Sequence, residues 1–224
     1  MLVLKFMVSN NFEKTIGNIG LFGGGFDPVH RAHTQMAKMA ADQFRLDSVR
    51  WIPVGNPAHK EIDTSAQHRL NMLQIALKNL KAERMVIDQR ELCNSISKPS
   101  YTCETIKSLM KDFPKKNFFW ILGEDQLLKF RSWKNWKWLL GNLVLVLCRR
   151  PEDNIRKRKS FGHLNETIKS LEEYGGKIIV LDIIPDSISS SFIRDLISKS
   201  QDPLNILDKE VYEYAKKNNL YSDQ

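Results

Sequence analysis

Short apolar runs alternate with amphipathic stretches along this chain, and this alternation constrains the fold more than any other feature of the sequence. The runs with the composition of β-strands are Ile19–Phe22, Val49–Val54, Met85–Ile87, Phe118–Leu122, Leu143–Cys148 and Lys177–Ile184. Most of them are continuously apolar, as expected of parallel strands that are buried on both faces. Strands that alternate with helices build doubly wound sheets. We therefore predict an α/β fold with an open sheet of five or six mostly parallel strands and helices on both faces.

The stretches between the strands have the periodicity of helices. Thr34–Phe44 places Met36, Ala37, Ala40 and Phe44 on one side, and Ser65–Leu80 repeats leucine at positions 70, 73, 77 and 80. A chain of 224 residues suits one domain of ordinary size. We predict a single domain over residues 19–224, preceded by an N-terminal extension over residues 1–18.

The composition restricts the classes of protein to which the chain can belong. Hydrophobic residues make up 42% and charged residues 27%, which argues against a largely disordered chain. No apolar run approaches the roughly 20 residues that cross a bilayer, so we expect no membrane partner. The net charge of +8 suits nucleic acids, acidic membranes and polyphosphates equally. The most basic stretch, Asn154–Ser160, has no interleaved aromatic residues, which favours a solvated loop over a nucleic-acid site.

Cysteine usage and the N-terminus indicate a cytoplasmic protein. The chain has three cysteines, Cys93, Cys103 and Cys148, and no two of them form a Cys-x-x-Cys pair. A zinc site or a disulfide framework is therefore not predicted. We expect three thiols that are buried or half-buried. Lys5 interrupts the apolar start of the chain, and no small-residue cleavage site follows it, so no signal peptide is predicted.

The first strand leads into a glycine turn, which is a favoured place for a ligand. In doubly wound sheets, ligands bind beyond the carboxyl ends of the strands. Gly23, Gly24 and Gly25 follow the strand, and glycines allow the backbone to approach a phosphate closely. The turn does not match the dinucleotide fingerprint, because Asp27 or Pro28 stands where that fingerprint needs a third glycine. A glycine cluster alone is weak evidence for a phosphate site.

Two histidines follow the glycine turn at a spacing that favours phosphate chemistry. His30 and His33 lie three residues apart near a helix start, so their rings can point the same way. Together with free backbone N–H groups they would form an electropositive cradle for a polyphosphate. The alternatives are a helix cap with incidental histidines, or half of a metal site. A metal site would need more ligands, and His59, His68 and His163 show no matching spacing, so none is predicted.

The segment from Gly23 to His33, GGGFDPVHRAH, resembles the signature of adenylyltransferases that carry an H-x-G-H or T-x-G-H motif. Those enzymes transfer a nucleotide to an acceptor phosphate and release pyrophosphate. This chain departs from the pattern at two positions. Ala32 replaces the usual glycine, which costs little because alanine is small and compatible with a helix. Gly25 stands where serine or threonine is common, and this change removes a hydroxyl contact to phosphate.

A second motif lies late in the chain. In Ile188–Asp195 a run of serines precedes Phe192, Ile193 and Arg194, and this order predicts an N-cap followed by the first turn of a helix. The same residues could be a well-capped helix and no more. The functional alternative is that serine hydroxyls, backbone N–H groups and a first-turn arginine together bind phosphates. The segment resembles the Ile-Ser-Ser-Thr/Ser-x-Ile/Val-Arg motif of the same adenylyltransferases.

Three middle segments bear on the acceptor. Ile52–Lys60 ends in the pair His59 and Lys60, Lys98–Ile106 contains Ser100, Tyr101 and Thr102 at a predicted helix start, and Ile121–Trp136 contains Asp125 and Trp133. Each has a structural alternative: Lys60 as a solvated side chain, Thr102 as a cap, Trp133 as a packing residue. Together these segments resemble the nicotinate-nucleotide adenylyltransferase family from roughly Asn18 to Tyr221.

This resemblance implies a Rossmann-like fold and adenylyl transfer from ATP, with Mg²⁺, to nicotinate mononucleotide in NAD biosynthesis. It implies catalytic roles for His30, His33 and Arg194. The implied ATP-binding residues are Gly23, Gly24, Gly25, Phe26, His30, His33, Ser189, Ser190, Ser191 and Arg194. The implied residues for nicotinate mononucleotide are Asp27, His59, Lys60, Tyr101, Thr102, Asp125 and Trp133.

Other functions fit parts of the pattern. Class I aminoacyl-tRNA synthetases share the first motif, but this chain is far shorter and lacks a Lys-Met-Ser-Lys-Ser-like signature. The pantetheine-phosphate adenylyltransferases are shorter, and their pattern lacks the Ser-Tyr-Thr segment. A nucleotide- or RNA-binding protein without turnover remains the alternative from another class. We expect small-molecule partners and no nucleic acid, and the sequence leaves a homo-oligomer open.

Overall fold

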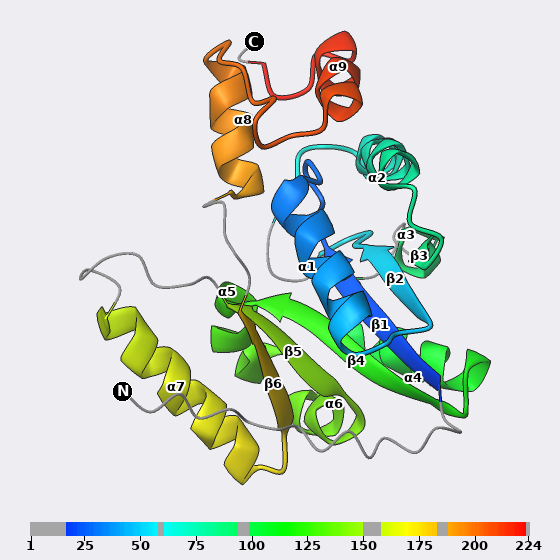
Figure 1. The fold of residues 1–224 in the computed structure, drawn as a ribbon, viewed down its shortest axis with the longest axis vertical. Helices are drawn as coiled ribbons and strands as arrows, with labels where there is room; N and C mark the ends of the chain where they lie inside the picture. The colour runs from blue at the N-terminus through cyan, green and yellow to red at the C-terminus, as the bar shows by residue number, and fades with distance from the viewer. Residues whose placement is uncertain (1–16, 58–60, 94–98, 150–157, 183–187, 223–224) are drawn as a thin grey trace.

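The computed structural model describes residues 17–57, 61–93, 99–149, 158–182 and 188–222. The strands among them are β1 (Gly17–Gly24), β2 (Ser48–Pro53), β3 (Met85–Ile87), β4 (Lys116–Gly123), β5 (Val144–Arg149) and β6 (Lys177–Asp182). They form a sheet in the order β3-β2-β1-β4-β5-β6, and every neighbouring pair is parallel (Figure 1). The predicted α/β class and parallel sheet are confirmed, and the fold is Rossmann-like.

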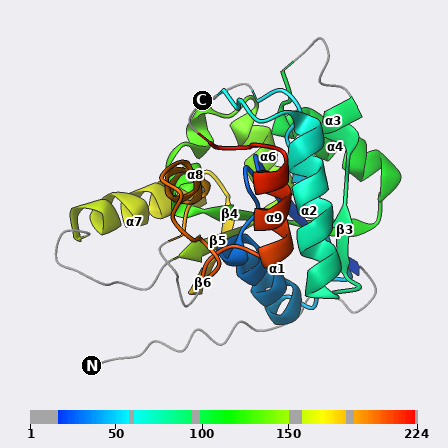
Figure 2. The same ribbon diagram turned by 90° about the horizontal axis from the view of Figure 1, so that it is seen from above.

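The helices in this part of the chain are α1 (Arg31–Gln43), α2 (Ala66–Leu80), α3 (Arg90–Cys93), α4 (Thr102–Asp112), α5 (Glu124–Leu128), α6 (Trp136–Asn142), α7 (Arg158–Glu173), α8 (Ser190–Ser198) and α9 (Lys209–Lys217), with a 3-10 turn, η1 (Phe130–Ser132). Figure 2 shows α1 and α6 on opposite sides of the sheet. None of the described helices combines the length and the apolar character that crossing a membrane requires.

Two hydrophobic cores, one on each face of the sheet, account for the continuously apolar strands. Successive residues of β4 alternate between them: Phe119 and Ile121 pack with α1 and α2, whereas Trp120 packs with α4 and α6. Side chains of a strand point to opposite faces in turn, so a strand covered on both sides must be apolar throughout. The predicted helices on both faces are therefore confirmed.

Several predicted boundaries were wrong at the ends of elements. The first strand begins at Gly17, inside the predicted extension, because Gly17 and Asn18 pair with residues of β4. It also continues to Gly24, because Gly23 and Gly24 pair with residues of β2. The first helix begins at Arg31 instead of Thr34. The last strand is described only to Asp182, so the predicted residues 183 and 184 lie outside the described part.

The sheet order reverses beside its first strand. From β1 the chain passes to β2 and β3 on one side, and later to β4, β5 and β6 on the other. In sheets of this kind the ligand binds beyond the carboxyl ends of the strands, at the place where the strand order reverses. The glycine turn after β1 lies at this place, so the fold puts the first motif at the favoured ligand position.

Candidate active site

The glycine turn is held by the packing beneath it. A Cβ atom on Gly23 would lie 2.8 Å from the Trp120 ring, and one on Gly24 would lie 3.1 Å from the Phe26 ring. Phe26 has a positive φ of 50°, which side-chain-bearing residues seldom adopt, and a cis peptide bond joins Asp27 to Pro28. The sequence interpretation attributed these glycines to phosphate approach, whereas the structure adds a steric reason for Gly23 and Gly24.

The two histidines form the start of α1. His30 is the N-cap and His33 the third helical residue, and their rings stack with centroids 3.7 Å apart. The backbone N–H of His30 donates to Nδ1 of His33 over 3.3 Å. Because Nδ1 accepts this bond, neutral His33 carries its proton on Nε2. His33 can therefore offer a hydrogen-bond donor from a helix N-terminus.

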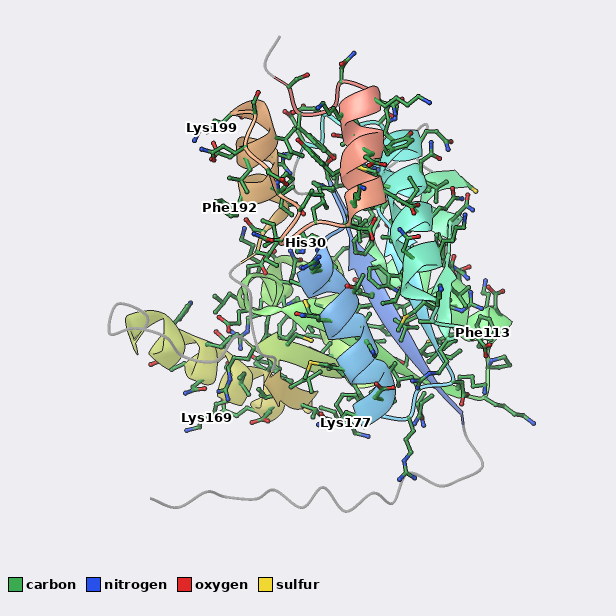
Figure 3. All side chains as sticks on the ribbon, turned by 45° about the horizontal axis from the view of Figure 1, so that its top comes forward. His30, Phe113, Lys169, Lys177, Phe192 and Lys199 are labelled. Carbon is green, nitrogen blue, oxygen red and sulfur yellow. The ribbon has the colours of Figure 1, made fainter. Side chains whose placement is uncertain are left out.

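The second motif lies against the first. Ser189 caps α8 by accepting a hydrogen bond from the Phe192 backbone, as predicted. The Ser190 hydroxyl donates to the carbonyl of Pro28 over 3.0 Å, and Arg194 Nη1 donates to the carbonyl of Asp27 over 2.8 Å. Figure 3 shows His30 at the start of α1 and Phe192 at the start of α8, on neighbouring elements. The tertiary structure brings the two distant motifs together.

Ser191 and Arg194 keep part of their surface accessible. Ser191 is exposed, and its hydroxyl accepts a bond of 3.4 Å from Arg194 Nη2. The Arg194 side chain is 37% exposed, so its guanidinium can reach a ligand as well as the loop that it holds. A planar guanidinium on a helix's first turns suits phosphate oxygens.

Asp27 is the centre of a polar network that the sequence did not predict. The residue is 7% exposed, its Oδ1 accepts a bond of 2.7 Å from the Tyr221 hydroxyl, and its Oδ2 lies 3.6 Å from Arg194 Nη1. Burial, together with the Asp27 charge, raises the pKa of Tyr221 well above its usual range, so the phenol stays protonated and donates. Tyr221 escaped sequence reasoning because nothing near it in the chain marks a site.

Arg69 is a second residue that the sequence analysis missed. Its side chain is 1% exposed and donates to the carbonyls of Gly25 (2.9 Å), Val54 (2.7 Å) and Thr64 (3.2 Å). Burial lowers the pKa of Arg69, against the raising effect of the Asp27 charge. The residue ties the glycine turn to the loop after β2. An arginine beside Leu70, on the apolar side of a helix, is the signal that could have revealed it.

Several of the predicted acceptor residues come from segments that lie beside one another at the start of α4. A bridge between Pro57 and Ser100 sets the loop after β2 beside the start of α4. Tyr101 is the N-cap of α4 and Thr102 its first residue, and the Tyr101 ring lies 4.1 Å from Lys134 Nζ. The α4 start and the loop after η1 are thus neighbours. His59 and Lys60 lie outside the described residues, so their predicted roles are not tested.

Trp133 and Asp125 lie near the carboxyl end of β4. The Trp133 ring centroid is 5.9 Å from that of Trp120 and 5.2 Å from that of Phe130, and the residue is partly buried. Trp120 also lies under Gly23, so it joins the glycine turn to Trp133. Asp125 is the second residue of α5 and accepts a hydrogen bond from its neighbour Gln126. Among the described residues, no hydrogen bond, ion pair or ring contact joins Asp125 to Thr102 or Trp133.

Two further predictions concern metal ligands and thiols. The described residues contain no group of three or more His, Cys, Asp or Glu side chains that could hold a metal ion. Cys103 and Cys148 are buried, and burial raises the pKa of Cys148 to about 12. Cys93 is exposed, so the expectation of a buried or half-buried thiol was wrong there: the short helix α3 ends at this residue.

Comparisons with known proteins agree with the geometry. The profile of the family described as "Cytidylyltransferase-like" matches residues 21–196. A relative from Bordetella petrii, named "Probable nicotinate-nucleotide adenylyltransferase", is 33% identical over 204 residues, covering 91% of this chain and 98% of the relative. A relative of the same name from Carboxydothermus hydrogenoformans is 34% identical over 204 residues, covering 91% and 97%.

A solved structure has the same fold. The Plasmodium falciparum nicotinic acid mononucleotide adenylyltransferase complexed with NaAD superposes with a TM-score of 0.74 at 22% identity, covering 92% of this chain and 97% of that one. This similarity supports the fold, a parallel sheet covered by helices. The assignment to a family rests on the relatives from Bordetella petrii and Carboxydothermus hydrogenoformans. The chain belongs to the nicotinate-nucleotide adenylyltransferase family, within the cytidylyltransferase-like nucleotidyltransferases.

Proposed function

We propose that this chain transfers the adenylyl group of ATP to nicotinate mononucleotide, giving nicotinate adenine dinucleotide and pyrophosphate for NAD biosynthesis. The observation that carries the proposal is the meeting of two motifs at one edge of the sheet, where Arg194 of α8 binds the Asp27 carbonyl beside the start of α1. Membership in the nicotinate-nucleotide adenylyltransferase family supports the choice of acceptor.

The reaction needs no nucleophile from the protein. A phosphate oxygen of nicotinate mononucleotide attacks the α-phosphorus of ATP, the bond from that phosphorus to the oxygen leading to the β-phosphorus breaks, and pyrophosphate leaves in line. The protein must position two polyanions and stabilise the charge that builds on the transferring group. Backbone N–H groups at the starts of α1 and α8, on adjacent elements, suit that task.

His33 and Arg194 have the chemistry for direct contacts to ATP. The Nε2–H of His33 would donate to a phosphate oxygen, because Nδ1 is engaged by the His30 backbone. Arg194 would bind phosphate with the part of its guanidinium that is exposed. His30 joins them as a catalytic residue in this proposal. The remaining proposed ATP contacts are Gly23, Gly24, Gly25, Phe26, Ser189, Ser190 and Ser191.

The acceptor would lie toward α4 and the loop after η1. The start of α4 at Thr102 presents backbone N–H groups, which favour the ring carboxylate of nicotinate over the neutral amide of nicotinamide. Trp133 would stack on the pyridine ring. Asp27, Tyr101 and Asp125 are further proposed contacts. His59 and Lys60 complete the set, as predicted from the sequence.

We propose that Mg²⁺ enters together with ATP. Magnesium prefers oxygen ligands and is bound in many nucleotide enzymes through substrate phosphates and few carboxylates. Asp27 is the carboxylate of the first motif, and its Oδ1 already accepts a hydrogen bond from Tyr221, so the phosphate oxygens of ATP would supply most of the ligands of the ion. When bound, the ion would neutralise charge on the phosphates of ATP and of the departing pyrophosphate.

An acceptor panel tests the proposal. Purified protein with ATP and Mg²⁺ is given nicotinate mononucleotide, nicotinamide mononucleotide or pantetheine phosphate, and pyrophosphate release is measured. We expect kcat/KM for nicotinate mononucleotide to exceed that for the amide by roughly 30- to 1000-fold, since the amide loses charge-assisted bonds. A nucleotide-binding protein without turnover would release none. Preference for pantetheine phosphate, or equal use of both mononucleotides, would contradict the acceptor assignment.

The setting of the reaction is part of the proposal. We infer that the enzyme works in the cytoplasm on these small molecules, without a nucleic-acid partner. Sedimentation of the purified chain would measure whether it forms a homo-oligomer, and cell fractionation would test its location.

A further inference from the structure

The chain returns to the glycine turn after its last helix. Figure 1 shows the segment that follows α9 running from α9 toward α8. Leu220 N donates to the carbonyl of Ala215 over 2.9 Å, which closes the end of α9. Tyr221 follows with a φ of 66°, and its side chain is directed back to Asp27.

The hydrogen bonds of the Tyr221 hydroxyl have a defined direction. A carboxylate oxygen accepts, so the hydroxyl donates its proton to Asp27 Oδ1 over 2.7 Å, and Met72 Sδ lies 3.8 Å from the same hydroxyl oxygen. Asp27 is buried, so this donor replaces water that the carboxylate has lost.

Asp27 in turn holds Arg194. The Asp27 carbonyl accepts a bond of 2.8 Å from Arg194 Nη1, and the same nitrogen lies 3.6 Å from Asp27 Oδ2. Tyr221 satisfies the other carboxylate oxygen. Without that hydroxyl, the carboxylate would be drawn into a closer ion pair with Arg194, and the guanidinium would have fewer donors for phosphate.

We propose that Tyr221 is a positioning residue for adenylyl transfer, which fixes the Asp27 carboxylate so that Asp27 directs Arg194 toward the phosphates of ATP. The role rests on the proposed function. It makes the segment after α9 part of the active site, although Tyr221 contacts neither substrate in this scheme. Arg69 supports the same turn from below through the Gly25 carbonyl.

The chain offers a matched control for the test. Tyr214 of α9 also has a partly buried hydroxyl with two partners, His68 at 2.9 Å and Asn71 at 2.7 Å, at the contact between α2 and α9. Tyr221→Phe and Tyr214→Phe each remove one bonded hydroxyl and keep the ring. We expect Tyr221→Phe to lower kcat/KM for ATP by about 10-fold, the scale of one lost bond to a charged group, and Tyr214→Phe to change it less than about 2-fold.

A double-mutant cycle separates positioning from general destabilisation. If Tyr221 acts through Arg194, Tyr221→Phe should have little further effect on kcat/KM in an Arg194→Ala background, whereas independent effects would multiply. Asp27→Asn provides a second variant, because it keeps the shape of the side chain but removes the carboxylate through which Tyr221 acts, and a loss of kcat/KM that also vanishes in the Arg194→Ala background is expected. It carries the test should Tyr221→Phe fold poorly, which circular dichroism would reveal.

The outcomes are distinguishable. Unchanged kcat/KM in Tyr221→Phe, equal losses in the two tyrosine variants, or multiplicative losses with Arg194→Ala would overturn the positioning role while leaving adenylyl transfer intact. A wild-type protein that releases no pyrophosphate from ATP and nicotinate mononucleotide would contradict the proposed function itself, and the positioning role with it.

Discussion

Arg194 donates a hydrogen bond of 2.8 Å to the backbone carbonyl of Asp27, across 167 residues of sequence. Beside it, Ser190 binds the carbonyl of Pro28. These two contacts fix the start of α8 against the turn that leads into α1, so that two helix N-termini serve one site.

His33→Ala should lower kcat by roughly 10²–10³-fold, the scale of losing one transition-state donor, while ATP affinity changes much less. His68→Ala is a matched control, because His68 is also the third residue of a helix, α2, whose cap is Ser65. Steady-state kinetics on folded variants measures both. A near-normal kcat for His33→Ala would exclude the proposed role.

Arg194→Ala should raise the KM for ATP, lower kcat, or do both, and Arg194→Lys should restore activity only in part, since lysine lacks the planar fork. Lys199→Ala removes a positive charge from the end of the same helix, where Lys199 pairs with Asp195, and should leave the kinetics unchanged. Melting temperatures are measured alongside. If Arg194→Ala unfolds the protein but leaves activity per folded molecule intact, the motif is only a capped helix.

Arg69→Met should destabilise the fold by about 3 kcal/mol, because it removes a buried side chain and leaves three partly buried carbonyls without their donor. Arg84→Met is the control: Arg84 is paired with Asp42 at a surface where its side chain is 43% exposed, and its loss should cost less than about 1 kcal/mol. Urea denaturation gives both free energies of unfolding. If Arg69→Met and Arg84→Met lowered the free energy of unfolding equally, the buried hydrogen bonds of Arg69 would contribute no more to stability than a surface ion pair.

Glu91→Gln should stabilise the protein at neutral pH. Burial raises the pKa of Glu91 above 4.5, against the hydrogen bond from Thr105, so the folded state favours the protonated carboxyl. The stability that the protonated Glu91 carboxyl contributes is fully present below pH 4.5 and is lost as the pH rises through the folded-state pKa. The gain from glutamine should therefore appear at pH 7 and vanish near pH 4 in denaturant titrations.

Asp88→Asn should have the opposite pH dependence, because the pKa of Asp88 is lowered whereas that of Glu91 is raised. Burial raises the pKa of Asp88, but hydrogen bonds and charge from Arg90 and the charge of Arg50 outweigh burial and hold it below 3.8. The stability that this carboxylate contributes is present above pH 3.8 and is lost as the pH falls through the folded-state pKa. Asparagine should thus destabilise at pH 7, with a cost that shrinks in acid. If the stability difference from the wild type changed with pH in the same direction for Glu91→Gln and for Asp88→Asn, the opposite pKa shifts of the two carboxyl groups would be contradicted.

Trp133→Ala should lower kcat/KM for nicotinate and nicotinamide mononucleotides alike, by roughly 10-fold, and leave their ratio almost unchanged, because stacking does not distinguish a carboxylate from an amide. Trp138→Ala removes another partly buried tryptophan, which Lys107 covers, and should affect neither acceptor. A ratio that collapses in Trp133→Ala would mean that this side chain also reads the ring substituent.

The sequence by itself determined the architecture and the places of the two phosphate motifs at helix starts. Continuous apolar runs mark strands covered on both faces, and the serines before Phe192 mark a helix start, because these signals act within a few residues. The start of α1 was placed three residues late, because His30 is an unusual cap that apolar periodicity does not reveal.

Only the tertiary structure decided which groups meet. Gly23 is required by the Trp120 ring, His33 owes its donor on Nε2 to the His30 backbone, and Arg69 is buried against carbonyls of other loops. Tyr221 reaches Asp27 from 194 residues away. Helix and strand propensities and apolar periodicity predict only how a residue interacts with residues close to it in the sequence. Contacts between remote residues depend on where each loop crosses the edge of the sheet, and that course follows from packing the whole chain.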